Sequence, residues 1–282
     1  MGFETIFIGN ESPYLETLNK LSDLSNIVCD PIRGTAGKVF GSAHQFAKKK
    51  KIAVVLPADF IRSPKQADII VVSGYSKRIP RKVIDSARVA TVNIHQSLLP
   101  AYRGRHPLNW AIIKGETHAG VTIHHVNEGF DEGNIILQKK VTISKNDNIM
   151  DVYWKATKTG CEMLYSFFDK AKKGNLKGFR QDPKLATYFP PRIPRDGKID
   201  WSEPAENIYN LVRALTYPYP GAYFYFRRKK MLIEIAKPEK QGPVGSKIGV
   251  PTFYRGACFV KTGSGFLKIA KLRNANLLVM KN

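Results

Sequence analysis

The chain has 282 residues, of which 43% are hydrophobic and 11% aromatic. This composition excludes a disordered polypeptide and suits one large domain or two unequal ones. Three widely separated cysteines form neither a disulfide framework nor a metal-ligand set, which favours a reducing compartment. No apolar run approaches the roughly 18 residues of a membrane span, and the N-terminus lacks the pattern of a secretory leader. We therefore expect a cytoplasmic protein that does not enter a membrane.

The chain is strongly basic, with 45 lysines and arginines against 23 acidic residues and a net charge of +22. Such an excess of positive charge makes a nucleic acid a candidate partner. However, the lysines are scattered along the whole chain, and only residues 48–51 form a true run of them. A run of this kind is typical of a solvated helix face. The charge therefore leaves open whether it serves a partner or reflects compositional bias.

The first half alternates short apolar runs with helical patterns, which predicts an α/β domain. Helices are expected at about residues 15–21, 44–51 and 149–170, and a loop at 33–40. Strands are expected at residues 5–8, 27–29, 52–56, 69–72, 89–92 and 121–126. Gly9 ends the first strand without a G-x-G-x-x-G pattern, so no dinucleotide site is predicted. We expect a Rossmann-like sheet, parallel or mixed.

The last third of the chain predicts a smaller β-rich domain. A basic, proline-rich stretch precedes a helix at 203–215, with Ser202 as its expected N-cap. Short strands then follow at 222–226, 231–235, 257–261 and 266–269, a spacing typical of a small open, OB-like barrel. The predicted organisation is a catalytic domain at 1–185, a linker at 186–202 and a C-terminal domain at 203–282.

Polar side chains gather at the end of the strand expected at 89–92. Asn93 and His95 are two residues apart, so period-two geometry puts both side chains on one face. Open α/β sheets place their ligand sites at this carboxyl end of the strands. Asp131 stands in a distant loop between Gly129 and Gly133, which permit sharp bends. We expect the amide, the imidazole and the carboxylate to meet.

These three groups suit direct transfer of an acyl group to an amine, which needs no serine or cysteine nucleophile. Asn93 can donate to a developing oxyanion, His95 can donate or move a proton, and Asp131 can orient the imidazole. Each residue alone could equally tie down a loop or shape a turn. His124 and His125 point to opposite faces of one expected strand, and we expect a structural role for the buried one.

Asn-x-His-x-Ser-Leu-Leu-Pro at residues 93–100, followed by the distant Asp131 loop, resembles the folate-dependent formyltransferases. The resemblance is specific from about residue 71 to 168 and weaker through the remaining chain. It implies transfer of a formyl group from N10-formyltetrahydrofolate to an amine, without a metal. It also implies that Asn93, His95 and Asp131 are catalytic.

The same resemblance implies where the reduced folate binds. Its pterin is expected against the loop of Ser73, Gly74 and Tyr75 and the loop that leads to Asp131. Backbone groups near Gly74, Tyr75 and Asn127 would read the edge of the pterin. The residues expected to bind the cofactor are Ser73, Gly74, Tyr75, Asn127, Gly129 and Asp131. A glycine such as Gly74 could also serve only to turn the chain.

Residues 102–110 are most similar to the branch that formylates nucleotide-linked amino sugars, whose acceptor would be dTDP-, GDP- or UDP-linked. The residues expected to bind this substrate are Tyr102, Arg103, Arg105, Asn109, Trp110 and Tyr219. In this interpretation the arginines face phosphates and Tyr219 stacks on a base. We expect a homodimer. The alternatives are a methionyl-tRNA formyltransferase, favoured by the charge, and an RNA-binding relative without catalysis.

Overall fold

The computed structural model of the chain describes residues 2–30 and 39–273. These residues form two compact units. The first comprises residues 1–107, 118–142 and 153–190, and the second comprises 108–117, 143–152 and 191–282. Most of the loop expected at 33–40 lies outside the described residues.

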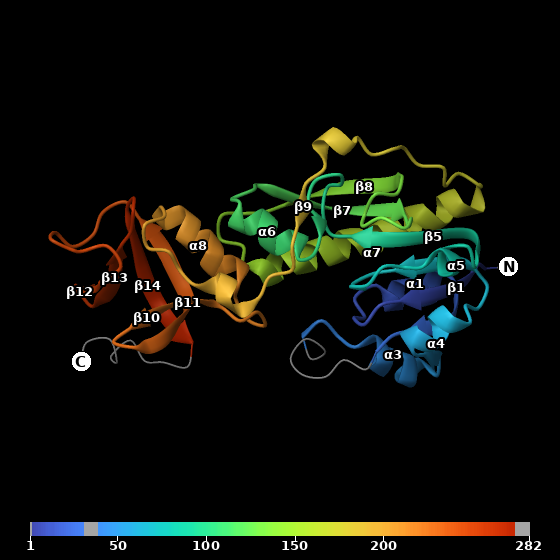
Figure 1. Cartoon of the computed structure of the whole chain (residues 1–282), viewed down its shortest axis with the longest axis horizontal. Helices are drawn as coiled ribbons and strands as arrows, with labels where there is room; N and C mark the ends of the chain where they lie inside the picture. The colour runs from blue at the N-terminus through green and yellow to red at the C-terminus, as the bar shows by residue number, and fades with distance from the viewer. Residues whose placement is uncertain (1, 31–38, 274–282) are drawn as a thin grey trace. The chain divides into compact units, whose positions relative to one another are not determined.

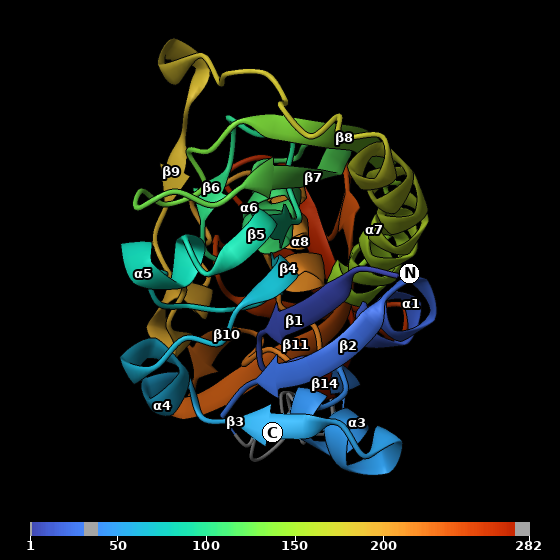
Figure 2. The same ribbon diagram turned by 90° about the vertical axis from the view of Figure 1, so that its right-hand side faces the viewer.

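The first unit is built on a seven-stranded sheet with the order β3-β2-β1-β4-β5-β7-β8 (Figure 2). Its strands are β1 (Glu4–Ile8), β2 (Asp23–Val28), β3 (Ala53–Val55), β4 (Ala67–Val72), β5 (Ala87–His95), β7 (His118–His125) and β8 (Ile135–Thr142). The first five strands in this order are parallel, whereas β7 and β8 run antiparallel to their neighbours. The prediction of a mixed, Rossmann-like sheet is confirmed.

Helices cover both faces of this sheet. They are α1 (Leu15–Leu21), α3 (Ala43–Lys50), α4 (Pro57–Arg62), α5 (Arg81–Ile84) and the greater part of α7 (Ile149–Lys172). The remaining helix of this region, α6 (Pro107–Ile113), lies almost wholly in the second unit. In Figure 2, α4 and α5 lie on one side of the strands and α1 and α7 on the other. Ile6 and Ile8 of β1 pack with Phe60 of α4 and Val83 of α5. Phe7 alternates with them and is fully buried. Both faces are covered, and accordingly residues 6–8 of β1 are consecutive apolar residues, all of them buried.

The strand order changes direction between β1 and β4, which is where α/β sheets form a ligand crevice. Gly9 follows β1 and Ser73 follows β4. A Cβ on Gly9 would lie 2.0 Å from the carbonyl oxygen of Ser73. Only glycine therefore permits these two loops to come together at the carboxyl end of the sheet.

The second unit contains a five-stranded antiparallel sheet that forms a half-barrel (Figure 1). In spatial order its strands are β10 (Ala222–Phe226), β11 (Lys229–Glu239), β14 (Phe266–Arg273), β13 (Ala257–Lys261) and β12 (Pro251–Tyr254). α8 (Ala205–Ala214) contributes Ile208 and Val212 to the core, where they join Ile233, Val260 and Leu267. The expectation of a small β-rich domain is confirmed. In the described part of the chain, no helix is long and apolar enough to cross a membrane.

Three local features differ from the sequence analysis or were missed by it. Ser202 does not cap α8, which begins after Pro204, and its hydroxyl instead donates to Asp200 at 2.6 Å. The edge strand β8 was not expected. β6 (Arg103–Gly104) pairs in parallel with β9 (Tyr188–Phe189), although β9 lies in the stretch expected to be a linker. The domain bounds themselves stay a prediction.

We expect Gly9→Ala to lower the free energy of unfolding by about 1–3 kcal/mol, because the added methyl group would collide with the Ser73 backbone. Urea unfolding monitored by circular dichroism measures the change. Gly2→Ala is the matched control, since a Cβ there would meet no atom within 4 Å. Equal stability of the two variants would contradict the close approach of the loops.

Candidate active site

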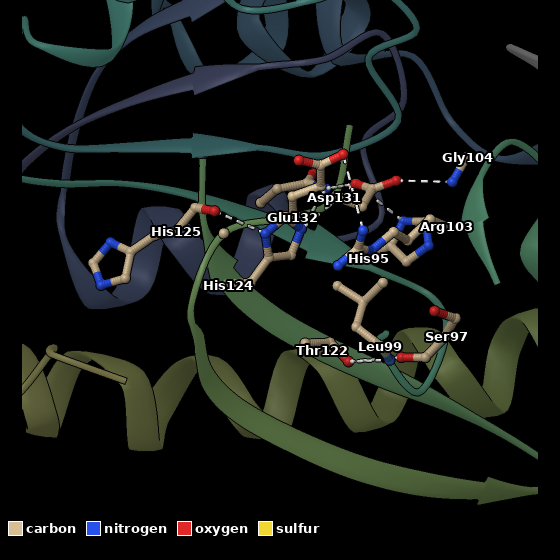
Figure 3. Close-up of polar contacts among 12 residues, drawn as sticks. His95, Ser97, Leu99, Arg103, Gly104, Thr122, His124, His125, Asp131 and Glu132 are labelled. Carbon is tan, nitrogen blue, oxygen red and sulfur yellow. Dashed lines mark hydrogen bonds and ion pairs between the residues drawn. The ribbon is translucent and has the colours of Figure 1, made fainter. Parts of the chain in front are cut away.

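The three residues expected to be catalytic lie together in the first unit, and Figure 3 shows two of them, His95 and Asp131. β5 carries Asn93 and His95 near its carboxyl end. Asn93 Nδ2 lies 3.2 Å from Oδ1 of Asp131, and His95 Nδ1 lies 3.6 Å from the same oxygen. The period-two spacing therefore brings the amide and the imidazole to one carboxylate.

Asp131 is mostly buried and lies in the loop between β7 and β8. Its φ of 58° is in the left-handed region, which aspartate tolerates better than most residues. Its Oδ2 accepts a hydrogen bond of 2.9 Å from the Gly104 backbone N–H. Burial alone would raise the pKa of the Asp131 carboxyl, but His95, His124 and this N–H hold that pKa well below its usual range. The group is therefore a carboxylate at neutral pH.

His124 belongs to the same cluster, which the sequence analysis did not anticipate. β7 pairs with β5 so that His124 stands opposite Asn93. Its Nε2 lies 3.1 Å from Asn93 Nδ2 and 3.5 Å from Asp131 Oδ1. Figure 3 shows the rings of His124 and His125 pointing apart, as the strand alternation predicts. The antiparallel pairing of β7 with β5 brings His124 to the site, and the sequence gives no direct signal for that pairing.

The hydrogen bonds restrict where the protons of this cluster lie. His124 Nδ1 is 2.8 Å from the carbonyl oxygen of His125, so Nδ1 carries a hydrogen, and in the tautomer with its hydrogen on Nδ1 alone Nε2 accepts from Asn93. A carboxylate only accepts, so the Asn93 amide nitrogen faces Asp131. Both N–H bonds of Asn93 are thus directed to protein acceptors. A substrate oxyanion must replace one of these acceptors to receive a hydrogen bond from Asn93.

His95 is arranged to hold a proton during a reaction. Its Nε2 lies 2.9 Å from the carbonyl oxygen of Tyr102, which only accepts, and its Nδ1 faces Asp131. If the ring becomes protonated, each N–H has an acceptor. The geometry therefore favours a transient imidazolium next to a carboxylate, as general acid–base catalysis requires.

The turn that follows β5 is held by side chains of β7 and β8. Thr122 donates its hydroxyl hydrogen to the Ser97 carbonyl at 2.7 Å. The Gln138 amide donates to the Leu99 carbonyl at 2.8 Å and to the Thr122 oxygen at 2.9 Å. The two antiparallel strands therefore fix the chain just beyond His95.

The loop expected to bind the pterin lies at the carboxyl end of β4. The backbone N–H of Ser73 bonds the Ile8 carbonyl, and Tyr75 packs against the core. Gly74 has a φ of 63°, and a Cβ there would meet nothing closer than Glu11 at 3.9 Å. Gly74 is exposed, and the pterin-binding role of this loop stays a prediction. Burial raises the pKa of the Glu11 carboxyl, which accepts a hydrogen bond from Tyr153.

The second loop expected at the pterin leads to Asp131. Asn127 is exposed, and a Cβ on Gly129 would collide with the carboxylate of Glu132. The cofactor-binding role of both residues stays a prediction. In the described part of the chain, no group of three or more histidine, cysteine or acidic residues could hold a metal ion.

Three residues expected to bind substrate lie in the first unit. The Tyr102 ring stacks on Phe189, with centroids 4.8 Å apart. Arg103 is buried and donates to Gln181, so its guanidinium faces protein. Arg105 is exposed and donates to the Ser76 carbonyl at 2.7 Å. Of the two arginines, Arg105 is the one presented at the surface.

The other three expected substrate residues lie in the second unit. Asn109 is buried and donates to the Ala214 carbonyl at 2.7 Å. The guanidinium carbon of Arg192 lies over the Trp110 ring, 4.6 Å from the centroid of that ring. The backbone N–H of Tyr219 bonds Thr216. These contacts bind the residues to their own unit, and their roles in recognition stay predictions.

The chain is similar to known formyltransferases over nearly its whole length. Residues 56–167 match the formyl transferase family and residues 193–281 match the formyl transferase C-terminal domain. A methionyl-tRNA formyltransferase of Caldanaerobacter subterraneus subsp. tengcongensis is 30% identical, over 95% of this chain and 91% of the relative. This identity and coverage establish the family.

Solved structures of sugar-modifying enzymes share the fold. An N-formyltransferase from Helicobacter canadensis, solved with folinic acid and dTDP-3-aminofucose, has a TM-score of 0.74 and 19% identity over 96% of this chain and 99% of its own. A sugar 3N-formyl transferase solved with dTDP and 5-N-formyl-THF has a TM-score of 0.73 and 22% identity over 98% and 100%.

The chain belongs to the formyltransferase family. It is a folate-dependent formyltransferase, with the α/β domain and the C-terminal domain of that family. The resemblance in residues 93–100 is thereby confirmed at the level of the family. The relatives include enzymes for two kinds of acceptor, so membership does not choose between them.

The lowered pKa of Asp131 predicts a pH-dependent contribution to stability. Unfolded aspartate titrates near pH 3.9, so the stabilisation is fully present above about pH 5 and is lost as the pH falls toward the folded pKa. We expect the difference in unfolding free energy between wild type and Asp131→Asn to shrink by about 1.4 kcal/mol per pH unit below about 3.9. Urea unfolding at a series of pH values measures this. A difference that does not change with pH would contradict the prediction.

Proposed function

We propose that the chain transfers a formyl group from N10-formyltetrahydrofolate to the amine of a nucleotide-linked amino sugar. The observation that carries the choice of acceptor is the position of Arg105. This exposed residue directly follows Gly104, whose N–H bonds Asp131, and its guanidinium is anchored on Ser76. A surface cation that directly follows the residue bonded to Asp131 suits a diphosphate, which arginine binds through forked contacts.

The catalytic steps follow from the hydrogen bonds of the cluster. The folate supplies the activated formyl group, and the amine attacks as the free base. Asn93 turns one N–H from its protein acceptor to the developing oxyanion, a contact worth on the order of 3 kcal/mol. His95 takes the proton that leaves the amine, and Asp131 stabilises the resulting imidazolium. His95 then returns the proton to the leaving nitrogen.

Formylation of methionyl-tRNA is the second candidate, supported by the relative that is 30% identical and by the charge. The second unit carries four consecutive basic residues at 227–230, over the turn between β10 and β11 and the start of β11. Beside it, Tyr225 is exposed and Lys230 Nζ lies 3.8 Å from the centroid of the Tyr223 ring. Basic and aromatic side chains together are typical of nucleic-acid binding.

We expect Asn93→Ala, His95→Asn and Asp131→Asn each to lower kcat by about 100-fold or more while KM changes little, because each group acts mainly in the transition state. Steady-state kinetics on the folded variants provides the measurement. His118→Asn is the matched histidine control, since His118 is exposed at the start of β7. Wild-type turnover in all three variants would remove the catalytic assignment.

The acceptor is identified by incubating the enzyme and formyl donor with dTDP-, GDP- and UDP-linked amino sugars and, separately, with charged initiator tRNA. We expect a mass gain of one formyl group on a nucleotide sugar, with weak salt dependence because few phosphates are bound. Rapid formylation of the tRNA alone would favour the second candidate.

Arg105→Ala tests the phosphate contact within the same assay. Loss of a charged hydrogen bond should raise KM for the nucleotide sugar about 10- to 100-fold, with KM for the folate unchanged. Arg62→Ala is the charge-matched control, because Arg62 is exposed on α4 and pairs with Asp59. Equal KM values in the two variants would show that Arg105 does not bind the acceptor.

A further inference from the structure

Gln181 joins both sides of the catalytic loop, although it lies in a stretch without a recognised motif. Its side chain is buried in the first unit. The amide nitrogen donates to the backbone carbonyls of Asp131 at 2.7 Å and Gly133 at 2.8 Å. One side-chain amide therefore uses both of its N–H bonds on the loop that carries the catalytic carboxylate.

Arg103 holds Gln181 from the opposite side. The Gln181 oxygen accepts from Arg103 Nη2 at 2.7 Å and from Nε at 3.2 Å. Arg103 also donates to the Tyr188 hydroxyl, which in turn donates to Glu132 Oε1 at 2.9 Å. The guanidinium is therefore bonded to Gln181 and Tyr188, both of which bond the loop that contains Asp131.

The backbone of Arg103 completes the frame around the carboxylate. Its N–H bonds the Thr187 carbonyl at 2.8 Å, and the next residue, Gly104, donates to Asp131 Oδ2. The side chain of Arg103 thus helps to position the backbone of the loop that contains Asp131, through Gln181 and Tyr188. The backbone of β6 positions the Asp131 carboxylate through the Gly104 N–H. Asp131 needs such support, because a non-glycine residue at a φ of 58° is strained by on the order of 1 kcal/mol or more.

We propose that Gln181 and Arg103 are positioning residues that hold Asp131 in its left-handed conformation and aim its carboxylate at His95 and Asn93. The inference rests on the catalytic role of Asp131 under the proposed function. It gives Arg103 a role inside the protein instead of on the phosphates of the acceptor.

The first test is Gln181→Ala. A displacement of the catalytic group by about 1 Å costs on the order of 100-fold in rate, so we expect kcat to fall 10- to 100-fold with KM for folate and acceptor within about threefold. Ser86→Ala is the control, because it also removes one buried hydrogen bond of the first unit, far from the loop in the chain. The control should keep wild-type kcat.

Gln181→Glu separates positioning from fold stability. Glutamate keeps an oxygen for Arg103 but cannot donate to the Asp131 and Gly133 carbonyls. We expect the melting temperature of Gln181→Glu to equal or exceed that of Gln181→Ala. We expect the kcat of Gln181→Glu to be as low as that of Gln181→Ala, or lower. If kcat instead follows the melting temperature across these variants, Gln181 is only structural and the proposal fails.

A double-mutant cycle with Asp131→Asn shows whether Gln181 acts through Asp131. We expect Gln181→Ala to lower kcat by less than twofold in the Asp131→Asn background. If Asp131→Asn is inactive and Gln181→Ala has wild-type kcat, the positioning role is wrong and the proposed catalysis stands. If Asp131→Asn keeps wild-type turnover, the catalytic assignment itself fails. A full additional loss in the double variant would show that Gln181 acts independently of Asp131.

Discussion

The site depends on one largely buried carboxylate that is compensated from several directions. Asp131 receives the Gly104 N–H on one oxygen and faces Asn93, His95 and His124 with the other. A buried charge is tolerated only where donors replace the water that it has lost. The elements that carry the groups around Asp131, β5, β6 and β7, must therefore keep their relative positions for the carboxylate to stay ionised. The pKa of Asp131 below its usual range reflects this compensation.

The parallel and antiparallel parts of the mixed sheet contribute different groups to the site. The strand order of the parallel part changes direction between β1 and β4, and the loops after Ile8 and Val72 come together there at the carboxyl end of the sheet. The antiparallel edge adds β7 and β8 beside β5, which supplies His124 and the side chains that fix the turn after His95. Cofactor recognition is expected at the parallel part, whereas the proton-handling groups lie where β5 meets the antiparallel edge. β5 is the strand common to both.

Local sequence patterns predicted the elements that depend on local physics, and they missed contacts that depend on strand pairing. The period-two spacing of Asn93 and His95 suffices to put both side chains on one face. His124 joins them only because β7 lies antiparallel to β5, and no local pattern specifies that neighbour. Gln181 lies in a polar, basic stretch, and its role depends on carbonyl groups about fifty residues away in the chain. Ser202 has the residue type of an N-cap, yet Asp200 binds its hydroxyl and α8 starts later.

The catalytic cluster cannot distinguish the two acceptors, because a sugar amine and the amine of methionine need the same oxyanion donor and the same proton carrier. The choice must lie in the groups that bind phosphate. A nucleotide sugar presents one diphosphate, which one well-placed fork of arginine donors can hold, whereas tRNA presents phosphates over a wide surface. Arg105 donates to the Ser76 carbonyl and directly follows Gly104, whose N–H bonds Asp131, whereas the lysines are scattered along the whole chain. Under the proposed function this position of Arg105 favours a small acceptor, since one arginine contributes through orientation and not through total charge.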